Sequence, residues 1–232
     1  LGAVLVEGTG EVEAYRFVLA LAQAIEKKGG EVRHGRVVGL KAKNGRVKAV
    51  ALESGEVSSE RVVLALGPWS LEASGWLGVS IPIEPLKGQI LRLRSPGLPL
   101  RCHVSQGHSY AGPKPDGLMW AGTTEEQVGF DERPSPAGRD SIVQWLLRIA
   151  PAFSDCEIVY HTACLRPMTP DALPLLGQVP GWEGVYLATG GGRKGILLSL
   201  AMGRITANLI LGRKPSLDIT PFSLTRFRPG TA

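Results

Sequence analysis

The chain has 232 residues, of which 44% are hydrophobic and 20% charged, with a net charge of +5. These values are ordinary for a globular protein, and no apolar run is long enough to predict a membrane span. The basic residues are scattered and are not interleaved with aromatic residues, so the sequence predicts no nucleic-acid partner. Three irregularly spaced cysteines argue against a disulfide framework or a metal site and favour a cytoplasmic protein.

The first part of the chain predicts a helix followed by antiparallel strands. Apolar residues recur at helical spacing from Val12 to Lys28, and a Gly-Gly pair ends the helix. From residue 31 to 67, Val and Leu alternate with polar residues, and turns at Asn44–Gly45 and Ser54–Gly55 divide the run. This pattern is typical of a β-meander. Its last strand, Arg61–Leu66, is almost wholly apolar, which suits a buried strand of a parallel sheet.

The second part predicts a β-rich region, one helix and a closing strand–loop–helix unit. In chain order these are short strands over 82–133, a helix over 137–149, a strand over 156–164, a strand over 185–189, a glycine loop over 190–195 and a helix over 196–211. The order predicts a mixed α/β (α+β) fold with two intertwined subdomains.

The glycine loop is the first candidate site. Gly190, Gly192 and Gly195 have the spacing G-x-G-x-x-G, and the following helix presents free N–H groups to an anion or an electron-rich atom. No acidic residue lies about 20 positions further on within the unit, since the next acid is Asp218 in a coil. We therefore expect a loop that faces a cofactor and not the primary pyrophosphate fingerprint. A tight strand-to-helix connection without a ligand is the alternative.

Two further segments are candidate sites. Two prolines and a Thr-Pro-Asp turn in CLRPMTPD (164–171) predict a rigid loop around Arg166, whose planar guanidinium suits a carboxylate ligand. The alternative is an ion pair between Arg166 and the nearby Asp171. The other segment is the end of the strand before Gly67 and Trp69, because open α/β sheets bind ligands outside the carboxyl ends of their strands. A simple turn is the alternative there.

Several stretches together resemble the D-amino-acid oxidase superfamily of FAD-dependent oxidoreductases, and within it the glycine oxidases and monomeric sarcosine oxidases. They are VVLALGPWS (62–70), PLKGQILRL (85–93), LRPMTPDALPLLG (165–177) and VYLATGGGRKGILLSLAMGRITANLILG (185–212). The resemblance implies a partial Rossmann-like FAD domain formed by residues 1–80 and 166–232, with a β-rich substrate domain inserted at 81–165.

The resemblance also implies a function. Such enzymes oxidise the C–N bond of a small amino acid or secondary amine by transferring hydride to FAD, and a homo-oligomer is possible. The family's opening glycine-rich segment and its ribose-binding acid are absent, and the chain starts without Met. We therefore expect an N-terminally truncated portion of such an enzyme. The alternative is an isolated domain that binds a ligand or a partner chain without flavin.

By position in these motifs, the resemblance assigns catalytic roles to Arg166 as carboxylate anchor, Tyr110 facing the substrate, and Arg193. For Tyr110 the alternative is packing on the other face of its strand. Cys164 lies four residues before Met168, the spacing of the cysteine that carries flavin covalently in sarcosine oxidases; a buried packing residue is the alternative. The predicted cofactor-binding set is Val32, Val38, Gly67, Trp69, Cys164, Gly190, Gly191, Gly192, Arg193, Lys194, Gly195 and Ile196. Sarcosine oxidases use a lysine where this chain has Leu197, so the carboxylate site resembles that of glycine oxidases.

Overall fold

The computed structural model describes residues 3–8, 10–97 and 100–227, and the chain divides into units 1–36 and 37–232. The first unit contains helix α1, Ala14–Lys27, which confirms the predicted helix. The residues after α1 are irregular up to Arg36, so a strand through Val32 is wrong. The reason is the register of the first hairpin. Its first strand begins at Val37, which pairs with Leu52, the last residue of the partner strand, so residues before Val37 have no partner on that strand.

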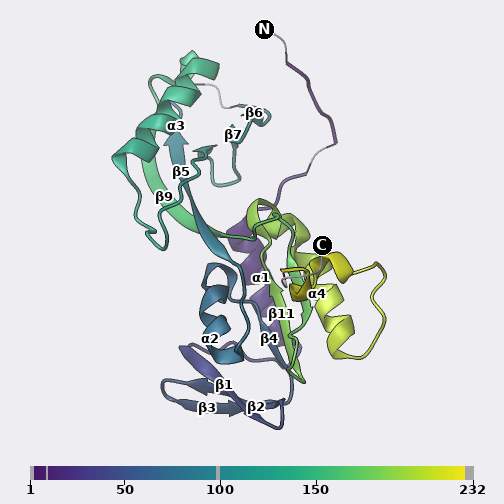
Figure 1. Cartoon of the computed structure of the whole chain (residues 1–232). Helices are drawn as coiled ribbons and strands as arrows, with labels where there is room; N and C mark the ends of the chain where they lie inside the picture. The colour runs from purple at the N-terminus through teal and green to yellow at the C-terminus, as the bar shows by residue number, and fades with distance from the viewer. Residues whose placement is uncertain (1–2, 9, 98–99, 228–232) are drawn as a thin grey trace. The chain divides into compact units, whose positions relative to one another are not determined.

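The second unit begins with the predicted β-meander. Strands β1 (Val37–Lys43), β2 (Arg46–Leu52) and β3 (Gly55–Ser58) form an antiparallel sheet in that order (Figure 1). Asn44 and Gly45 connect β1 to β2 with φ angles of 53° and 76°. Two consecutive left-handed residues are what a tight hairpin turn requires, which explains the Asn-Gly pair.

A second sheet contains the parallel pair that the apolar strands predicted. Strand β4 (Val62–Leu64) lies parallel to β11 (Val185–Thr189), and β10 (Leu175–Gln178) is antiparallel to β11. Helix α4 (Gly195–Ile210) follows β11, as expected. Strand β4 is shorter than predicted because the 3₁₀ helix η1 (Gly67–Glu72) and helix α2 (Ala73–Leu77), neither of which the sequence pattern indicated, follow it closely.

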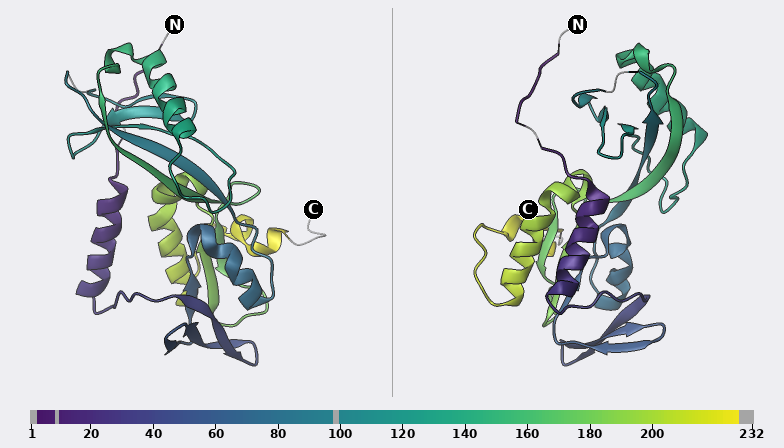
Figure 2. Two further views of the ribbon diagram at one scale, coloured as in Figure 1. Left: turned by 90° about the vertical axis from the view of Figure 1, so that its left-hand side faces the viewer. Right: turned by 180° about the vertical axis from the view of Figure 1, so that it is seen from behind.

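The third sheet has five strands in the order β6-β7-β8-β5-β9. Their bounds are Val104–Gln106 (β6), Ser109–Pro113 (β7), Met119–Gly122 (β8), Glu84–Arg94 (β5) and Glu157–Met168 (β9). Helix α3, Pro136–Ile149, covers one face of this sheet (Figure 2). Trp145 and Leu146 of α3 pack there against Leu91 and Ala121. The remaining 3₁₀ helices are Pro151–Phe153, Gly192–Lys194, Thr220–Phe222 and Leu224–Phe227.

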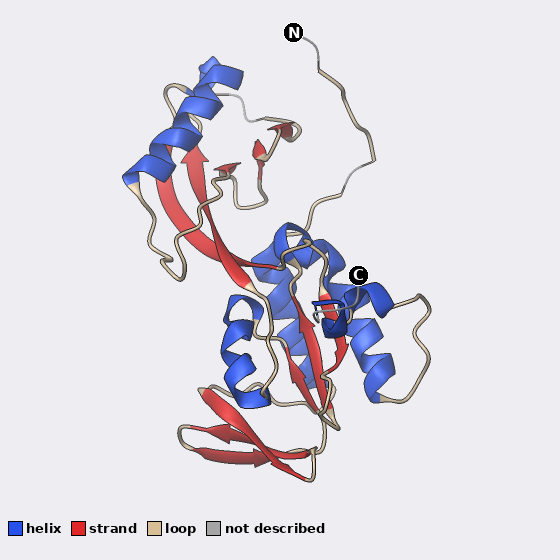
Figure 3. Ribbon diagram, viewed as in Figure 1, coloured by secondary structure: helices blue, strands red, loops and turns tan. Residues whose placement is uncertain are grey.

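Strand β9 continues further than the sequence predicted, to Met168. Arg166 therefore lies on a strand and not in a rigid loop, which corrects the expectation. Two features explain the difference: β9 is at the edge of its sheet, where proline is tolerated, and Pro167 pairs with Pro85 of the long strand β5. Figure 3 shows β5 and β9 as the two longest strands, running together out of the five-stranded sheet. The predicted mixed α/β fold class is confirmed.

Replacing Gly184 by alanine should destabilise the chain. Gly184 precedes β11 with a φ of +83°, and a Cβ atom there would lie 2.3 Å from the carbonyl oxygen of Glu60. Because the obstacle is backbone and the φ angle is left-handed, we expect a loss of roughly 2 kcal/mol or more in the free energy of unfolding. Gly75→Ala is the control, since nothing lies within 4 Å of its Cβ position. Urea unfolding in which both variants match the wild type would contradict this reading.

Candidate active site

The five-stranded sheet has one face covered by α3 and an opposite face that carries the predicted site residues. Tyr110 pairs with Gly122, and Gly122 also pairs with Ile90 of β5. Ile90 in turn pairs with Thr162 of β9. Because side chains alternate between the two faces of a sheet, Cys164 and Arg166, which are two and four residues after Thr162, lie on the same face as Tyr110. The register thus brings together Tyr110, Cys164 and Arg166. We call this surface the substrate face.

Arg166 is held in a defined position on the substrate face. Its Nη2 donates to Thr123 Oγ1 at 2.7 Å, and its Nη1 donates to the carbonyl oxygen of Thr124 at 3.3 Å. The guanidinium lies on Gly88, where a Cβ atom would be 2.2 Å from Nη2. In the described part of the chain no ion pair involves Arg166. Its hydrogen-bond partners are neutral oxygens, and the nearest carboxylate that feels its charge, that of Glu125, is paired with Arg193.

The alternative pairing of Arg166 with Asp171 is wrong. Asp171 instead binds Arg226, whose Nε donates to Oδ2 at 2.7 Å and whose Nη2 donates to Oδ1 at 3.0 Å. This bidentate contact lowers the pKa of Asp171 to about 2. The ion pair ties the turn after β9 to the 3₁₀ helix Leu224–Phe227, which leaves Arg166 to the substrate face.

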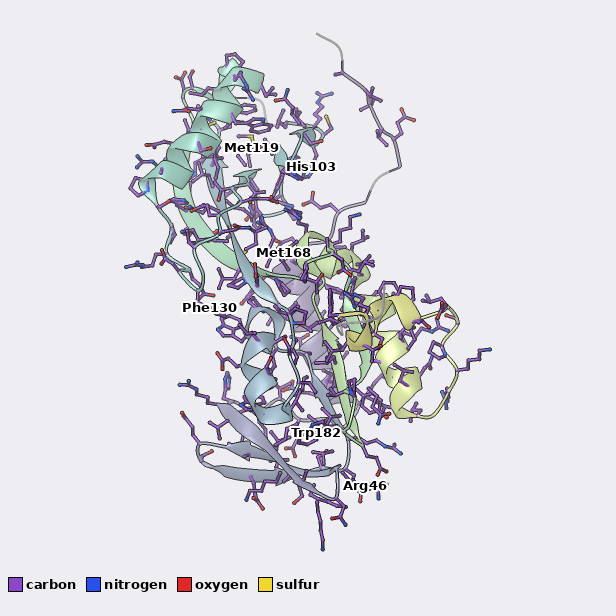
Figure 4. The ribbon with its side chains drawn as sticks, in the orientation of Figure 1. Arg46, His103, Met119, Phe130, Met168 and Trp182 are labelled. Atoms are coloured by element: carbon purple, nitrogen blue, oxygen red, sulfur yellow. The ribbon has the colours of Figure 1, made fainter. Side chains whose placement is uncertain are left out.

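Tyr110 is half-buried beside Arg166. Burial raises the pKa of its phenol above 10.0, while the positive charge of Arg166 acts in the opposite direction. The hydroxyl therefore stays protonated at neutral pH and can donate a hydrogen bond. The ring of His103 lies 6.4 Å from that of Tyr110, and Figure 4 shows His103 on the β6–β7 side of the sheet. Gly112 gives room for this imidazole, since a Cβ atom there would be 2.4 Å from it.

The glycine loop joins β11 to α4 as predicted. Gly190 and Gly192 have φ angles of 72° and 52°, and a Cβ atom on Gly191 would lie 2.7 Å from the Cα atom of Gly195. The backbone of Gly195 leaves no room for a Cβ atom on Gly191, so only glycine permits this tight turn. Lys194 and Ile196 are exposed at the start of α4. Met168, labelled in Figure 4 where β9 leaves the sheet, lies next to Gly192.

Arg193 of this loop makes an ion pair that the sequence did not indicate. Its Nε and Nη2 donate to the two carboxylate oxygens of Glu125 at 2.5 and 2.6 Å. The hydrogen bonds from Arg193 lower the pKa of Glu125. Glu125 belongs to the segment after β8, so this pair connects the glycine loop to the sheet that carries Arg166.

The carboxyl ends of β4 and β11 meet at one edge of their sheet. Ser70 Oγ donates to the carbonyl oxygen of Gly67 at 2.7 Å and lies 2.7 Å from Thr189 Oγ1. These buried hydroxyls join the two strand ends, next to the glycine loop. Trp69 is 44% exposed there, and its ring stacks on that of Phe130 at 6.2 Å.

The other predicted cofactor residues lie apart from the glycine loop in the sequence. Val38 is exposed on β1, and Val32 lies in the irregular segment of the first unit. Cys164 is exposed on the substrate face, opposite Gly88. Sequence reasoning missed Thr123, Thr124, Glu125 and Gly88. The one available signal was a polar run, GTTEE, directly after an apolar strand.

Among the described residues, no group of three or more His, Cys, Asp or Glu side chains is arranged to hold a metal ion. Within the same ranges, no helix combines the length and the apolar composition that crossing a bilayer requires.

The Asp171–Arg226 pair predicts a pH-dependent contribution to stability. The pKa of Asp171 falls from 3.8 to about 2 on folding, so its contribution is complete above about pH 4 and is lost as pH falls towards about 2. Because Asp171 is 35% exposed, we expect Asp171→Asn to cost only roughly 1 kcal/mol at pH 7. The difference from wild type should shrink between about pH 4 and about pH 2. Urea unfolding measures it, with Asp140→Asn as the exposed-pair control; a pH-independent difference would contradict the assignment.

Comparisons with known proteins identify the family of the chain. A family model described as FAD dependent oxidoreductase matches residues 1–209. The chain is 33% identical to a glycine oxidase of Pseudomonas aeruginosa, over 95% of this chain and 61% of that protein. It is also 33% identical to hydrogen cyanide synthase subunit HcnC of the same species, over 96% of this chain and 54% of that protein.

The solved structure of glycine oxidase from Geobacillus kaustophilus matches with a TM-score of 0.85 and 30% identity, covering 90% of this chain and 57% of that one. The chain thus spans 61% or less of the length of these relatives. Since the family model covers most of its residues, the chain belongs to the FAD-dependent oxidoreductase family that the sequence motifs indicated.

Proposed function

We propose that this chain supplies the substrate face and the flavin-facing loop of an enzyme that oxidises the C–N bond of a small amino acid or secondary amine. The observation that carries the proposal is Arg166. Its guanidinium is fixed on Gly88 by two neutral oxygens, so its positive charge remains for an anionic ligand. A planar, immobilised guanidinium suits the two oxygens of a carboxylate.

Tyr110 and Arg166 would act together on an amino acid. Arg166 binds the carboxylate, and the protonated Tyr110 hydroxyl, held beside it, donates a hydrogen bond that orients the substrate. The sheet behind them excludes water from one side of the bound molecule. Positioning of this kind is the protein's main contribution in enzymes whose cofactor does the redox chemistry.

The residues of the glycine loop fit the cofactor of the family. When bound, FAD supplies the acceptor for the hydride that leaves the substrate carbon. Nothing lies within 4 Å of the Cβ position of Gly195, so a flat ring system can approach the loop there, and the N-terminus of the 16-residue helix α4 favours electron-rich atoms. The joined ends of β4 and β11, at Gly67 and Thr189, give a second stretch of backbone for the cofactor.

The similar proteins support the substrate class. The relatives are named as a glycine oxidase and a subunit of hydrogen cyanide synthase. Because the chain spans 61% or less of their length, activity of the whole enzyme is part of the proposal. So is the division into FAD-domain parts at 1–80 and 166–232 and a substrate domain at 81–165; β9 runs across the second boundary.

A second candidate function is binding of a partner chain or ligand without flavin. The observation that favours it is the apolar surface of α4, where Ile196, Leu197 and Leu200 are 43%, 79% and 63% exposed. Such a surface is typical of a protein interface. Titration of the chain with FAD, followed by flavin fluorescence, tests this, because saturable flavin binding would favour the first candidate over the second.

In the flavin-loaded protein, Arg166→Lys should raise KM for an amino acid about 10- to 100-fold, since lysine keeps the charge but loses the planar pair of donors. KM for an uncharged amine should change little. Steady-state kinetics with glycine and with an uncharged amine measure this split. Arg94→Lys is the control, because Arg94 pairs with Glu157 at the exposed end of the same two strands. An unchanged KM for glycine would remove Arg166 from the substrate site.

We expect flavin bound to this chain to be non-covalent. Cys164 lies beside Gly88, its partner inside the β5–β9 pair, and a thioether would need its thiolate held against the flavin ring. Acid precipitation of the flavin-loaded protein should therefore leave all flavin fluorescence in the supernatant. A fluorescent pellet in the wild type and a dark pellet in Cys164→Ser would instead show a covalent bond to this cysteine.

A further inference from the structure

The segment Thr123–Glu126, which follows β8, has one side that contacts the candidate active site. Thr123 Oγ1 and the carbonyl oxygen of Thr124 accept the hydrogen bonds of Arg166. Glu125 accepts both hydrogen bonds of Arg193 from the glycine loop. The position of this segment therefore determines where both guanidinium groups lie.

The other side of the segment is fastened to the main chain of β5. Lys87 N donates to the carbonyl oxygen of Glu126 at 3.0 Å, and Glu126 N donates to that of Lys87 at 2.9 Å. Gln89 N donates to Thr124 Oγ1 at 3.0 Å. The segment thus extends the sheet beyond the end of β8, with Lys87 and Gln89 as its neighbours.

The side chain of Lys87 adds a buried charge to this attachment. It is 2% exposed, and its Nζ lies 3.3 Å from Glu126 Oε2 and 3.8 Å from Asp131 Oδ2. Nζ also donates to the carbonyl oxygen of Arg133 at 3.1 Å. Burying an ammonium is costly, and an apolar residue would stabilise a sheet as well or better. The Lys87 ammonium instead holds the carboxylate of Glu126 in place.

Gln89 fixes the same carboxylate from a second direction. It is fully buried, and its Nε2 donates to Glu126 Oε1 at 2.6 Å and to Ser135 Oγ at 2.9 Å. Its Oε1 accepts from Ser135 N at 2.8 Å and lies 2.8 Å from His161 Nε2. Gly138 of α3 makes room for this amide, since a Cβ atom there would lie 2.1 Å from Gln89 Nε2. The amide therefore has a single orientation.

Neither side chain can touch a substrate. Lys87 and Gln89 alternate along β5 with Gly88, whose position lies under the Arg166 guanidinium on the substrate face. Both therefore point to the α3 side of the sheet. Any effect that they have on the active site must pass through the Thr123–Glu126 segment.

We propose that Lys87 and Gln89 are positioning residues, which fix the Arg166 guanidinium from behind the sheet by holding Glu126 and Thr124. The relevance of this positioning to catalysis rests on the proposed role of Arg166 as carboxylate anchor. The positioning step itself concerns only residues of this chain. Thr124 Oγ1 donates to the same Glu126 carboxylate, so loss of either side chain loosens Glu126 and with it Thr124. The guanidinium then no longer has one orientation, although the main-chain hydrogen bonds to β5 remain.

The test is NMR spectroscopy of the Arg166 guanidinium in the 232-residue chain. Its signals are assigned by their disappearance in Arg166→Lys. Hydrogen bonds to Thr123 and Thr124 restrict rotation of the guanidinium, so we expect separate Nη–Hη resonances in the wild type. In Gln89→Met, which keeps the size but removes the amide, these resonances should merge into one averaged signal. Arg94→Gln, which breaks an exposed ion pair on the same strands, should leave them separate.

A merely structural role would leave the guanidinium signals unchanged in a folded variant, and that result would overturn the proposal. If Gln89→Met does not fold, the double variant Lys87→Met/Glu126→Leu decides the question, because it leaves no unpaired charge from this pair. The flavin-loaded Gln89→Met protein should also show KM for glycine raised about 10-fold, with kcat little changed. Merged signals without a change in KM would support positioning but contradict the proposed role of Arg166.

Discussion

The pairing of β5 with β9 is the constraint on which the candidate site depends. The two strands are in register from Glu84–Met168 to Arg94–Glu157, with one irregularity. This register sets Gly88 under the Arg166 guanidinium and Cys164 beside it on the substrate face. It also decides that Lys87 and Gln89 point the other way, towards α3. A shift by one residue would exchange the two sets of side chains and remove the site.

The three arginines near the site are used differently, and this difference indicates function. Arg226 and Arg193 each make a bidentate ion pair, with Asp171 and Glu125. Those pairs fasten the turn after β9 and the glycine loop to other parts of the fold. Arg166 binds only neutral oxygens among the described residues, although its position is equally well fixed. A fixed guanidinium without a carboxylate partner is suited to a carboxylate that arrives from solution.

The sequence predicted the elements with strong local patterns: helix α1, the β-meander, the parallel strands and the glycine loop. It missed α2, which has only five residues, and it ended β9 too early, because prolines normally interrupt strands. Of the candidate site, the sequence indicated Arg166 and Tyr110. The partners of Arg166 are 42 and 43 residues away in the sequence, so no local periodicity can indicate Thr123 or Thr124. Their contact follows from the register of three strands, which only the structure supplies.

The buried polar side chains of Lys87 and Gln89 were likewise not predictable from the sequence. In KGQ, Lys87 and Gln89 alternate with Gly88, and by periodicity alone they belong to a face that is otherwise apolar, with Leu91 and Leu93. A stable sheet does not need a buried lysine there, and the cost of burying one is met by Glu126, Asp131 and a carbonyl oxygen. All of these partners lie between β8 and α3. Charge buried on one face of β5 thus fixes the geometry of a charge presented on the other, and the glycine between them lets the second charge lie close to the sheet.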